Sequence, residues 1–393
     1  LLRSSLGFNG AKFFGLIRSL VGIFLFGIQT YFLSKILTYL IRILLFTIDE
    51  SLLVQDIFIF YFYGLNIIDW SSIIIVIIFQ TLLFSVGAQY NKKIINFSAI
   101  SVYVGIVIFF LLVLLSDVKL TSKAFVNILN TKNFLDLNNL APLLTVAGTV
   151  FAYFSILIIS FGDISRNVKN AKELDKGNLS LIINLIIFSF FSIFIVAGSD
   201  ALLNQKFSDI DRIFTNPTDI IGKYDNTQIT TLVLFFIVIA SASTNLVANY
   251  IPSQYSLINF IPSKLSLRSA SYIISFLGLL VAIFWLTILS QIGILSFVDT
   301  FGAFFGPLFG VMIADYYLIK NQTLSNKDLY LVDRDSNYYY SRGWHIKGVY
   351  SIFLGFIFSA STIWNTNLMF LQSYAWLIGA FVAWITYYLL AKK

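Results

Sequence analysis

The sequence contains no cysteine, and charged side chains make up only 11% of its 393 residues. The lack of cysteine excludes disulfides, thiol chemistry and iron–sulfur clusters within these residues. The low charge content excludes an ordinary soluble domain, in which about 25% of residues are charged. Hydrophobic residues instead make up 58% of the chain, and the mean hydropathy is +0.85. This composition predicts an all-α polytopic membrane protein embedded in a lipid bilayer.

Long apolar runs give the number of membrane spans. A helix needs about 20 apolar residues to cross the hydrocarbon core, and this length predicts ten spans. They cover Phe13–Leu33, Ser71–Val86, Ala99–Leu115, Ala141–Phe161, Leu179–Ala197, Thr230–Tyr250, Ala270–Ser290, Ile294–Ile319, Gly348–Trp364 and Ser373–Leu390. The apolar segment Ile36–Tyr63 is predicted to be a loop or an interfacial helix.

The placement of basic residues gives the orientation. If the first span starts in the cytoplasm, most of the 26 Lys and Arg residues fall on the cytoplasmic side. Arg18 is placed among these cytoplasmic residues. The positive-inside rule then predicts a multi-pass protein of the plasma membrane with a cytoplasmic C-terminus. The same placement explains the net charge of +7, so no nucleic-acid partner is needed. The oligomeric state is left open.

Titratable groups are scarce at membrane depth. Asp and Glu are absent from the middle of the predicted spans, which argues against a carboxylate proton relay. The one histidine, His345 in "RGWHIKG", is expected to be a plain loop residue rather than a metal ligand. With no Ser–His pair, paired carboxylates or metal cluster in the spans, an intramembrane enzyme lacks support.

The sixth predicted span ends in an unusual run of polar residues, "ASASTNLVANYIP". Polar groups inside a membrane are costly and usually face a cavity or another helix. Ala240, Ser243 and Thr244 are spaced i, i+3, i+4 and therefore share one helix face. A carbonyl and two hydroxyls on that face suit a small hard cation such as Na⁺, although a second helix must complete the site. In the alternative interpretation, the hydroxyls bond back to carbonyls of their own helix.

The amide side chains of Gln29, Asn245 and Asn249 also have two interpretations, which are ligand binding and helix packing. Asn245 and Asn249 form an i, i+4 pair on a different face, and Asn249 offers both a donor and an acceptor to an amide-like ligand. Such residues also join helices to one another. Gln29, in "LFGIQTYF", is explained on its own more readily by helix packing than by ligand binding.

Two further features concern packing and gating. Tyr153 and Phe154 in the fourth span form an aromatic face that either stacks on a planar ring or faces lipid. The glycines of "FGAFFGPLFG" in the eighth span are spaced by four and predict a small-residue packing face. Pro307 interrupts the hydrogen-bond ladder there, so this helix is either a bending gate or a static kink.

Five stretches resemble the nucleobase:cation symporter-1 family. They are "RSSLGFNGAKFFGLIRSLVGIFLFGIQTYF" (third helix), "FGDISRNVKNAKE" (end of the sixth), "SASTNLVANYIPSQYSLINFIPSKLSLR" (eighth), and "FGPLFGVMIADYYLIKNQTLSNKDLY" with "YYYSRGWHIKG" (tenth and the following loop). The similarity covers nearly the whole chain in the right order. Gly-Ile-Gln-Thr, Asp-x-Ser-Arg, Ser-Thr-Asn-x-x-Ala-Asn and Ala-Asp-Tyr-Tyr are jointly specific.

The resemblance implies a secondary-transporter fold of two five-helix inverted repeats followed by two C-terminal helices. In this single transmembrane domain, residues 1–137 would be the remainder of the first repeat. Residues 138–320 would be the second repeat, and residues 321–393 a cytoplasmic loop with the two extra helices. The family's first two helices have no counterpart here, and the first of them contributes to both the cation site and the substrate site.

The resemblance also implies a function. Its members carry planar heterocycles such as uracil, allantoin or hydantoin with a Na⁺ or H⁺ gradient, and need no other cofactor. On that template Ala240, Ser243 and Thr244 fall on the cation site, and Gln29 and Asn249 on substrate hydrogen-bonding positions.

The walls of the site depart from the family pattern. Leu25 stands where many members stack a Trp on the substrate, and Phe154, next to Tyr153, stands at the second aromatic wall. Because one wall of the site is weaker, the identity of the substrate is left open. A less aromatic substrate such as allantoin is relatively favoured. The alternative is a truncated membrane protein without transport, or a ligand-binding sensor of the same fold.

Overall fold

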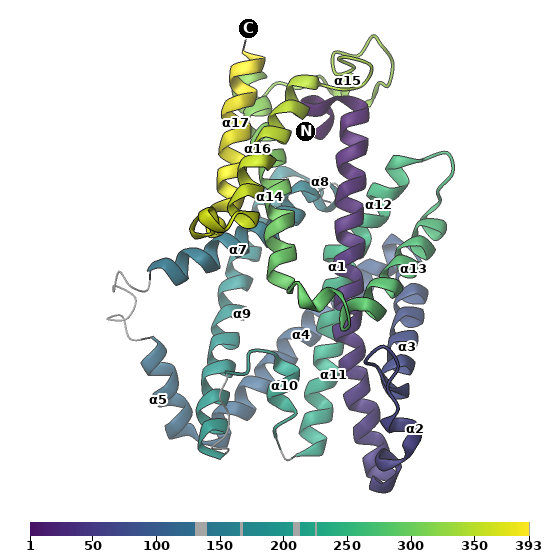
Figure 1. The fold of residues 1–393 in the computed structure, drawn as a ribbon, viewed down its shortest axis with the longest axis vertical. Helices are drawn as coiled ribbons and strands as arrows, with labels where there is room; N and C mark the ends of the chain where they lie inside the picture. The colour runs from purple at the N-terminus through teal and green to yellow at the C-terminus, as the bar shows by residue number, and fades with distance from the viewer. Residues whose placement is uncertain (130–139, 166–167, 207–212, 225, 393) are drawn as a thin grey trace.

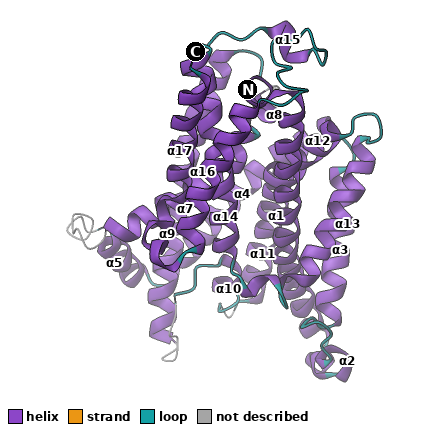
Figure 2. Cartoon of the chain, turned by 45° about the horizontal axis from the view of Figure 1, so that its top comes forward, coloured by secondary structure: helices purple, strands orange, loops and turns teal. Residues whose placement is uncertain are grey.

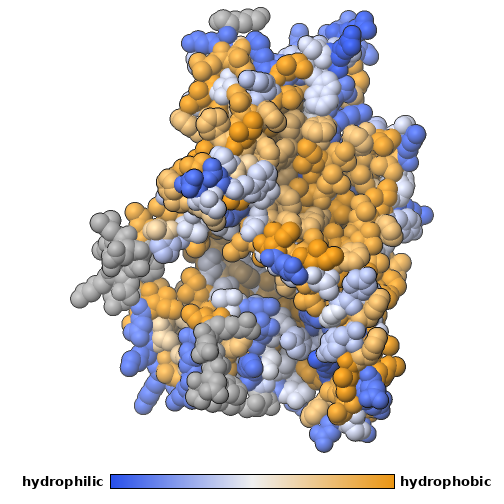
Figure 3. Space-filling view, viewed as in Figure 1, coloured by the Kyte–Doolittle hydropathy of each residue, from blue (hydrophilic) through white to orange (hydrophobic). Residues whose placement is uncertain are grey.

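The computed structural model describes the chain apart from residues 130–139, 166–167, 207–212, 225 and 393 (Figure 1). The described part is helical and contains no strand, only two isolated β-bridges in turns. Ten of its helical segments are long and apolar enough to cross a membrane, which confirms the predicted number of spans. Apolar residues cover the middle of the visible face, and polar residues gather toward its two ends, as expected of a membrane-spanning bundle (Figure 3).

The elements follow one another with short connections. The first part of the chain forms α1 (Leu2–Ile48), the 3₁₀ helix η1 (Glu50–Val54), α2 (Asp56–Ile59), α3 (Ile67–Phe84), α4 (Ala88–Ser116), α5 (Val118–Ile128), α7 (Leu140–Ile159), α8 (Phe161–Ser165) and α9 (Ala171–Lys206). The remainder forms α10 (Pro217–Ile221), α11 (Thr227–Thr244), the π-helix η3 (Asn245–Tyr250), α12 (Ile251–Phe260), α13 (Leu267–Trp285), η4 (Leu289–Gln291), α14 (Ile294–Ile313), the π-helix η5 (Ala314–Ile319), α15 (Asn326–Tyr330), α16 (Ile346–Trp364), η6 (Thr366–Tyr374) and α17 (Ala375–Ala391).

The first helix is longer than the sequence predicted. Helix α1 covers 47 residues, with non-helical backbone only at Gly7 (φ 79°), so the prediction of a loop or interfacial helix is wrong for Ile36–Ile48. The polar residues that seemed to end the span have partners. Lys35 forms an ion pair with Asp69 of α3 at 2.9 Å, and the Thr38 hydroxyl donates to the same carboxylate at 3.2 Å. A polar side chain that is paired on a neighbouring helix does not need to leave the bundle.

Helix α1 lies at the centre of one layer of the bundle. It packs on α3, on the continuous α11–η3–α12 segment and on α13, while α14 packs with α7, α16 and α17 beside that layer (Figures 1 and 2). Both termini lie at the same end of the bundle, which we call the terminal end (Figure 1). Because α1 and α11–η3–α12 run in opposite directions, the middle of α1 faces the junction between α11 and η3.

The glycines of α14 form the close-packed face that their spacing predicted. A Cβ on Gly306 would lie 2.4 Å from the carbonyl oxygen of Trp376, and one on Gly310 would lie 2.0 Å from that of Ala380. The backbones of α14 and α17 therefore touch. Helix α14 continues through Pro307, which is buried against Gly355 and Gly379. This tight packing favours the static-kink interpretation of Pro307.

We predict that Gly310→Ala destabilises the protein by about 1–3 kcal/mol, because the new methyl group has no room and the two helices must separate. Gly177→Ala on α9 is the matched control, since nothing lies within 4 Å of its added Cβ. That control should raise stability by about 0.5–1 kcal/mol through its higher helix propensity. Thermal unfolding of both purified variants in detergent checks the prediction, and equal unfolding temperatures would contradict it.

Candidate functional site

The candidate site forms where the helix geometry changes near the middle of the bundle. Helix α11 ends at Thr244, and Asn245 begins the π-helix η3. π-helical turns inside longer helices are rare and occur frequently at functional sites. Asn245 and Asn249 are both buried here and face α1. The two residues that form the predicted i, i+4 pair are therefore directed into the protein rather than toward lipid.

The structure brings Asn249 and Gln29 together, although they are far apart in the sequence. The Asn249 amide nitrogen donates to Gln29 Oε1 at 3.0 Å and to Asn245 Oδ1 at 2.9 Å. Gln29 Nε2 in turn donates to the carbonyl of Ser241 at 3.1 Å. Two helices that are far apart in the sequence thus share one amide cluster.

Other polar groups hold this cluster in place. Asn245 Nδ2 donates to the Phe26 carbonyl at 3.2 Å and to Thr30 Oγ1 at 3.3 Å. The Thr30 hydroxyl lies 2.9 Å from Gln80 Oε1 on α3, and Gln80 Nε2 is buried with no hydrogen-bond partner. Sequence reasoning missed Thr30 and Gln80 as supports of the site. The available signal was the single amide in the apolar run "IIIVIIFQTLLF".

Counting donors and acceptors shows what the cluster still offers. Asn249 uses both of its N–H groups, so only its carbonyl oxygen Oδ1 remains, with no hydrogen bond from the described residues. Gln29 uses its carbonyl oxygen and one of its two N–H groups. One acceptor and one donor are therefore left on two side chains that are hydrogen-bonded to each other. This pair is complementary to a –CO–NH– edge, in which a carbonyl accepts and an adjacent N–H donates.

The predicted cation face shows the bonding of the alternative interpretation. Ser243 Oγ donates to the Ala240 carbonyl at 3.0 Å, and Thr244 Oγ1 donates to the same oxygen at 2.9 Å. Both hydroxyls therefore bond back to their own helix. The arrangement still gathers three neutral oxygens within one turn, and such oxygens suit a hard cation. Three are too few for full coordination, and the Na⁺ site stays a prediction.

The predicted ring-stacking residues lie in different surroundings. Leu25 is 8% exposed and packs in the main hydrophobic cluster of the bundle. The rings of Tyr153 and Phe154 contact each other edge-on, with centroids 5.7 Å apart, and Tyr153 is 40% exposed. The structure unites Gln29 with Asn249, whereas the roles of Leu25, Tyr153 and Phe154 as walls of a substrate site stay predictions.

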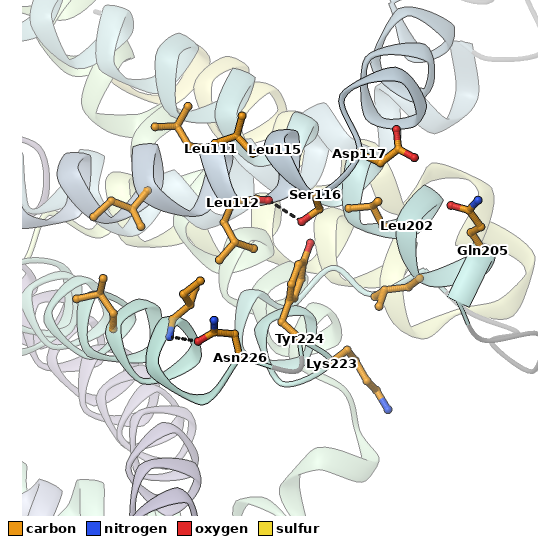
Figure 4. A pocket seen from close by; sticks show the side chains of 14 residues that line it. Leu111, Leu112, Leu115, Ser116, Asp117, Leu202, Gln205, Lys223, Tyr224 and Asn226 are labelled. Atoms are coloured by element: carbon orange, nitrogen blue, oxygen red, sulfur yellow. Dashed lines mark hydrogen bonds between the residues drawn. The ribbon is translucent and has the colours of Figure 1, made fainter.

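A larger cavity lies elsewhere and does not belong to this cluster. It has a volume of about 1010 Å³ and lies between α4, α9 and α11 at the end of the bundle opposite the termini (Figure 4). Tyr224 points into it beside Leu112 and Ser116, while Lys223 points away. Most of its lining is leucine and isoleucine, and Asp117 and Asn226 at its rim cap the starts of their own helices. The Tyr224 hydroxyl is buried there without a hydrogen-bond partner, so the cavity offers a single buried unused polar group in a mostly apolar lining.

A second buried polar cluster fastens the terminal end. The Asp315 carboxylate in η5 pairs with Lys320 at 2.6 Å and accepts hydrogen bonds from the Tyr387 hydroxyl at 2.6 Å and the Ser4 hydroxyl at 3.1 Å. His345 is part of this cluster, because its Nδ1 lies 2.9 Å from the Ser5 carbonyl. Its ring stacks on Tyr340 with centroids 4.0 Å apart. The expectation of a plain loop residue is therefore wrong for His345.

These features define a class: a polytopic membrane protein with a buried polar site between its helices, as found in secondary transporters. Comparison with known proteins makes the class specific. Residues 1–385 match the family described as permeases for cytosine/purines, uracil, thiamine and allantoin, and the chain belongs to that family. The family consists of permeases, not enzymes.

Individual relatives are distant but consistent. The allantoin permease of Bacillus subtilis is 25% identical over 62% of this chain and 48% of its own length. The purine-uracil permease NCS1 of Arabidopsis thaliana is 24% identical over 100% of this chain and 65% of its own length. The chain thus spans about half to two thirds of the length of these curated relatives.

A solved structure has the same fold. Mhp1, a nucleobase-cation-symport-1 family transporter with bromovinylhydantoin bound, matches 98% of this chain and 76% of its own chain, with 18% identity and a TM-score of 0.69. This similarity confirms the predicted fold class. The division of the chain at residues 137 and 320 into repeats stays a prediction.

We predict that lowering the pH weakens the terminal end through His345. Burial lowers the pKa of His345, so between its folded value and the ordinary value of about 6.5 the unfolded chain binds more protons than the folded one. Stability from this residue is complete above pH 6.5 or so and falls as the pH drops below it. Nearby Asp315 favours protonation, and Lys320 and Lys347 oppose it.

The test compares His345→Asn, which keeps a side-chain N–H but does not titrate in this range, with the wild type. Between about pH 7.5 and about pH 5.5 the wild-type unfolding temperature should fall further than that of the variant. Parallel decreases in the two proteins would contradict this role of His345.

Proposed function

We propose that the full protein is a secondary transporter that imports a planar heterocycle carrying an amide or imide edge, driven by a Na⁺ gradient. One observation carries this proposal: Gln29 and Asn249 meet inside the bundle and leave one donor and one acceptor unused. A buried site built to pair both groups discriminates strongly against molecules that leave them unpaired.

The names of the relatives support the same substrate chemistry. They are described as permeases for allantoin, for purines and uracil, and for hydantoin. Uracil, allantoin and hydantoin share a ring with adjacent carbonyl and N–H groups. That edge is the complement of Gln29 Nε2–H beside Asn249 Oδ1. We therefore propose a ureide or imide ring as the substrate, with Phe154 covering one face and Leu25 the other.

Leu25 narrows the range of substrates that we propose. An aliphatic side chain packs on a ring without the added stabilisation of an aromatic pair, which is about 0.5–1.5 kcal/mol. The loss of one aromatic wall weakens binding of extended aromatic rings more than binding of a small, partly saturated one. Within the proposed class, this favours allantoin or a simple hydantoin over a purine.

For the coupling ion, Na⁺ has more support than H⁺. Ala240, Ser243 and Thr244 present three neutral oxygens within one turn, directly before the residues that form the amide cluster. The carboxylates that the structure describes near the bundle interior, Asp69 and Asp315, are both committed to lysines. A relay that exchanges protons with the amide cluster would need an available carboxylate beside it.

The orientation follows from charge. We propose that the terminal end faces the cytoplasm of a cell bounded by the plasma membrane, because basic residues concentrate there. The described residues of that end include Arg3, Lys12, Lys264, Arg268, Lys320, Lys327, Arg334, Arg342, Lys347 and Lys392.

We predict that Asn249→Ala in the full-length protein lowers uptake of the transported ring by about a hundredfold, because the ring N–H loses its acceptor and Gln29 loses its partner. Asn96→Ala, on the exposed surface of α4, is the matched control and should transport normally. Uptake of labelled uracil, allantoin and hydantoin is measured in cells together with the amount of folded protein in the membrane. Normal uptake by Asn249→Ala would refute the assigned substrate site.

We predict that Thr244→Ala raises the Na⁺ concentration needed for half-maximal uptake at least about tenfold, because one of the proposed oxygen ligands is lost. Thr231→Ala is the matched control: Thr231 lies on the same helix and makes the same kind of back-bond, to the Thr227 carbonyl at 2.8 Å. Uptake is measured against Na⁺ concentration at constant pH. Wild-type uptake that never responds to Na⁺ would replace this proposal with proton coupling.

A further inference from the structure

A fully buried arginine reaches the carbonyl of Ala248, the residue before Asn249 of the amide cluster. Arg18 of α1 is 1% exposed, although the sequence tally counted it among the cytoplasmic charges. Its Nε donates to Ser160 Oγ at the end of α7 at 2.6 Å, and its Nη2 donates to the Ala248 carbonyl of η3 at 2.9 Å. Its third nitrogen, Nη1, has no hydrogen-bond partner. A buried guanidinium with an unused nitrogen is costly and calls for an acceptor.

A second unused donor lies beside it. Ser253 is 0% exposed, and its Oγ also has no hydrogen-bond partner. Both atoms border the same point: a Cβ on Gly22 would lie 2.0 Å from Ser253 Oγ, 2.4 Å from Arg18 Nη1 and 3.1 Å from the Asn249 carbonyl oxygen. Two unused donors therefore meet next to the backbone of the residue that carries the proposed substrate contact.

The same arginine borders a cavity at the terminal end. This cavity has a volume of about 510 Å³, within the range of small-molecule sites, and lies between α1, α7–α8 and α12. Of its polar lining residues Arg18 and Ser160 are buried, whereas Lys12, Asp163, Ser256 and Asn259 are more exposed. Polar groups thus follow one another from Gln29 and Asn249, past Arg18 and Ser253, into the cavity.

We propose that Arg18 and Ser253 form a second binding position for the carbonyl edge of the transported heterocycle, between the amide cluster and the terminal end. The two N–H groups of Nη1 and the Ser253 hydroxyl are donors without acceptors, whereas a ring carbonyl is an acceptor with two lone pairs. A ring that leaves Asn249 toward the terminal end therefore exchanges its contacts with the amide pair for contacts with Arg18. This inference rests on the proposed function, since it takes the same ring as its ligand.

The 393-residue sequence contains no cysteine, so a single introduced cysteine can be labelled selectively. In the full-length protein, with any cysteine outside these residues replaced by serine, Ser256→Cys places one thiol on the cavity wall. Inside-out membrane vesicles expose the terminal end under the proposed orientation, and a membrane-impermeant maleimide then labels that thiol. Uracil, allantoin and hydantoin are each added as the probe, with sodium acetate as a simple carboxylate. We expect at least one ring, added at about ten times its Kd, to slow labelling about tenfold, and acetate to have no such effect.

Four variants locate the protection. In Arg18→Gln and in Ser253→Ala the ring should lose its protecting effect, because each variant removes a proposed donor. Ser253→Ala keeps every charge and adds no atom, so it also covers the case in which Arg18→Gln fails to fold. Asn249→Ala should leave the protection in place, because the ring binds at Arg18 and not at the amide cluster. Lys12→Gln, which removes a charge from the outer wall alone, should change the labelling rate with the ring by less than about twofold.

The outcomes separate the two proposals. Protection that survives both Arg18→Gln and Ser253→Ala, or that disappears equally in Asn249→Ala, overturns the second position. Protection by acetate and by none of the rings overturns it as well, and assigns the donors to an anion. If the labelling results are as expected but the wild type takes up none of the three rings, the position at Arg18 stands and the transport proposal fails.

Discussion

In the hydrocarbon core of a membrane there is no water to pair with a polar group, and every polar side chain must find its partner in the protein. This constraint organises the bundle around α1. Lys35 and Thr38 remain helical because Asp69 accepts from both. Gln29 faces the α11–η3 junction because Ser241 and Asn249 complete its amide. The hydrophobic helices determine that a bundle forms, whereas these few polar contacts determine which helices are neighbours and in what register.

The same constraint makes the buried polar groups without a hydrogen-bond partner informative. Because most buried polar groups in the described part of the chain are paired, a group that lacks a partner marks a strained position or one that a ligand completes. Gln29 and Asn249, which are hydrogen-bonded to each other, leave one donor and one acceptor unused, and the two unused donors of Arg18 and Ser253 border the same point at Gly22. Gln80 Nε2 is also unpaired, but it lies behind the amide cluster and its oxygen supports Thr30. Its effect is therefore on the position of Asn245 rather than on a ligand directly.

Length and hydrophobicity were sufficient to predict the ten spans, since these are local properties of the sequence. The contacts of individual polar residues were not local, and there the sequence was a poorer guide. Helix α1 extends to Ile48 because Lys35 is paired with a residue of the next long helix, and His345 is half-buried because α1 begins beside it. The i, i+4 spacing correctly predicted that Asn245 and Asn249 share a face. It could not show that the hydroxyls of Ser243 and Thr244 both turn to Ala240, because spacing alone leaves both orientations open.

The change from α- to π-helix links the two proposed sites physically. Thr244 is the last residue of α11, and Asn245 is the first residue of η3, so the cation face and the amide pair share a peptide bond. In the proposed mechanism a bound Na⁺ competes with the hydroxyl hydrogens of Ser243 and Thr244 for the Ala240 carbonyl oxygen. Any resulting change in this turn is transmitted directly to Asn245, which holds Asn249 and is itself held by Phe26 and Thr30. A ligand shifts an equilibrium only through its different affinities for two states, and reciprocity then requires the ring to affect Na⁺ affinity equally. The coupling therefore needs no long pathway, because one helical turn carries both sets of contacts.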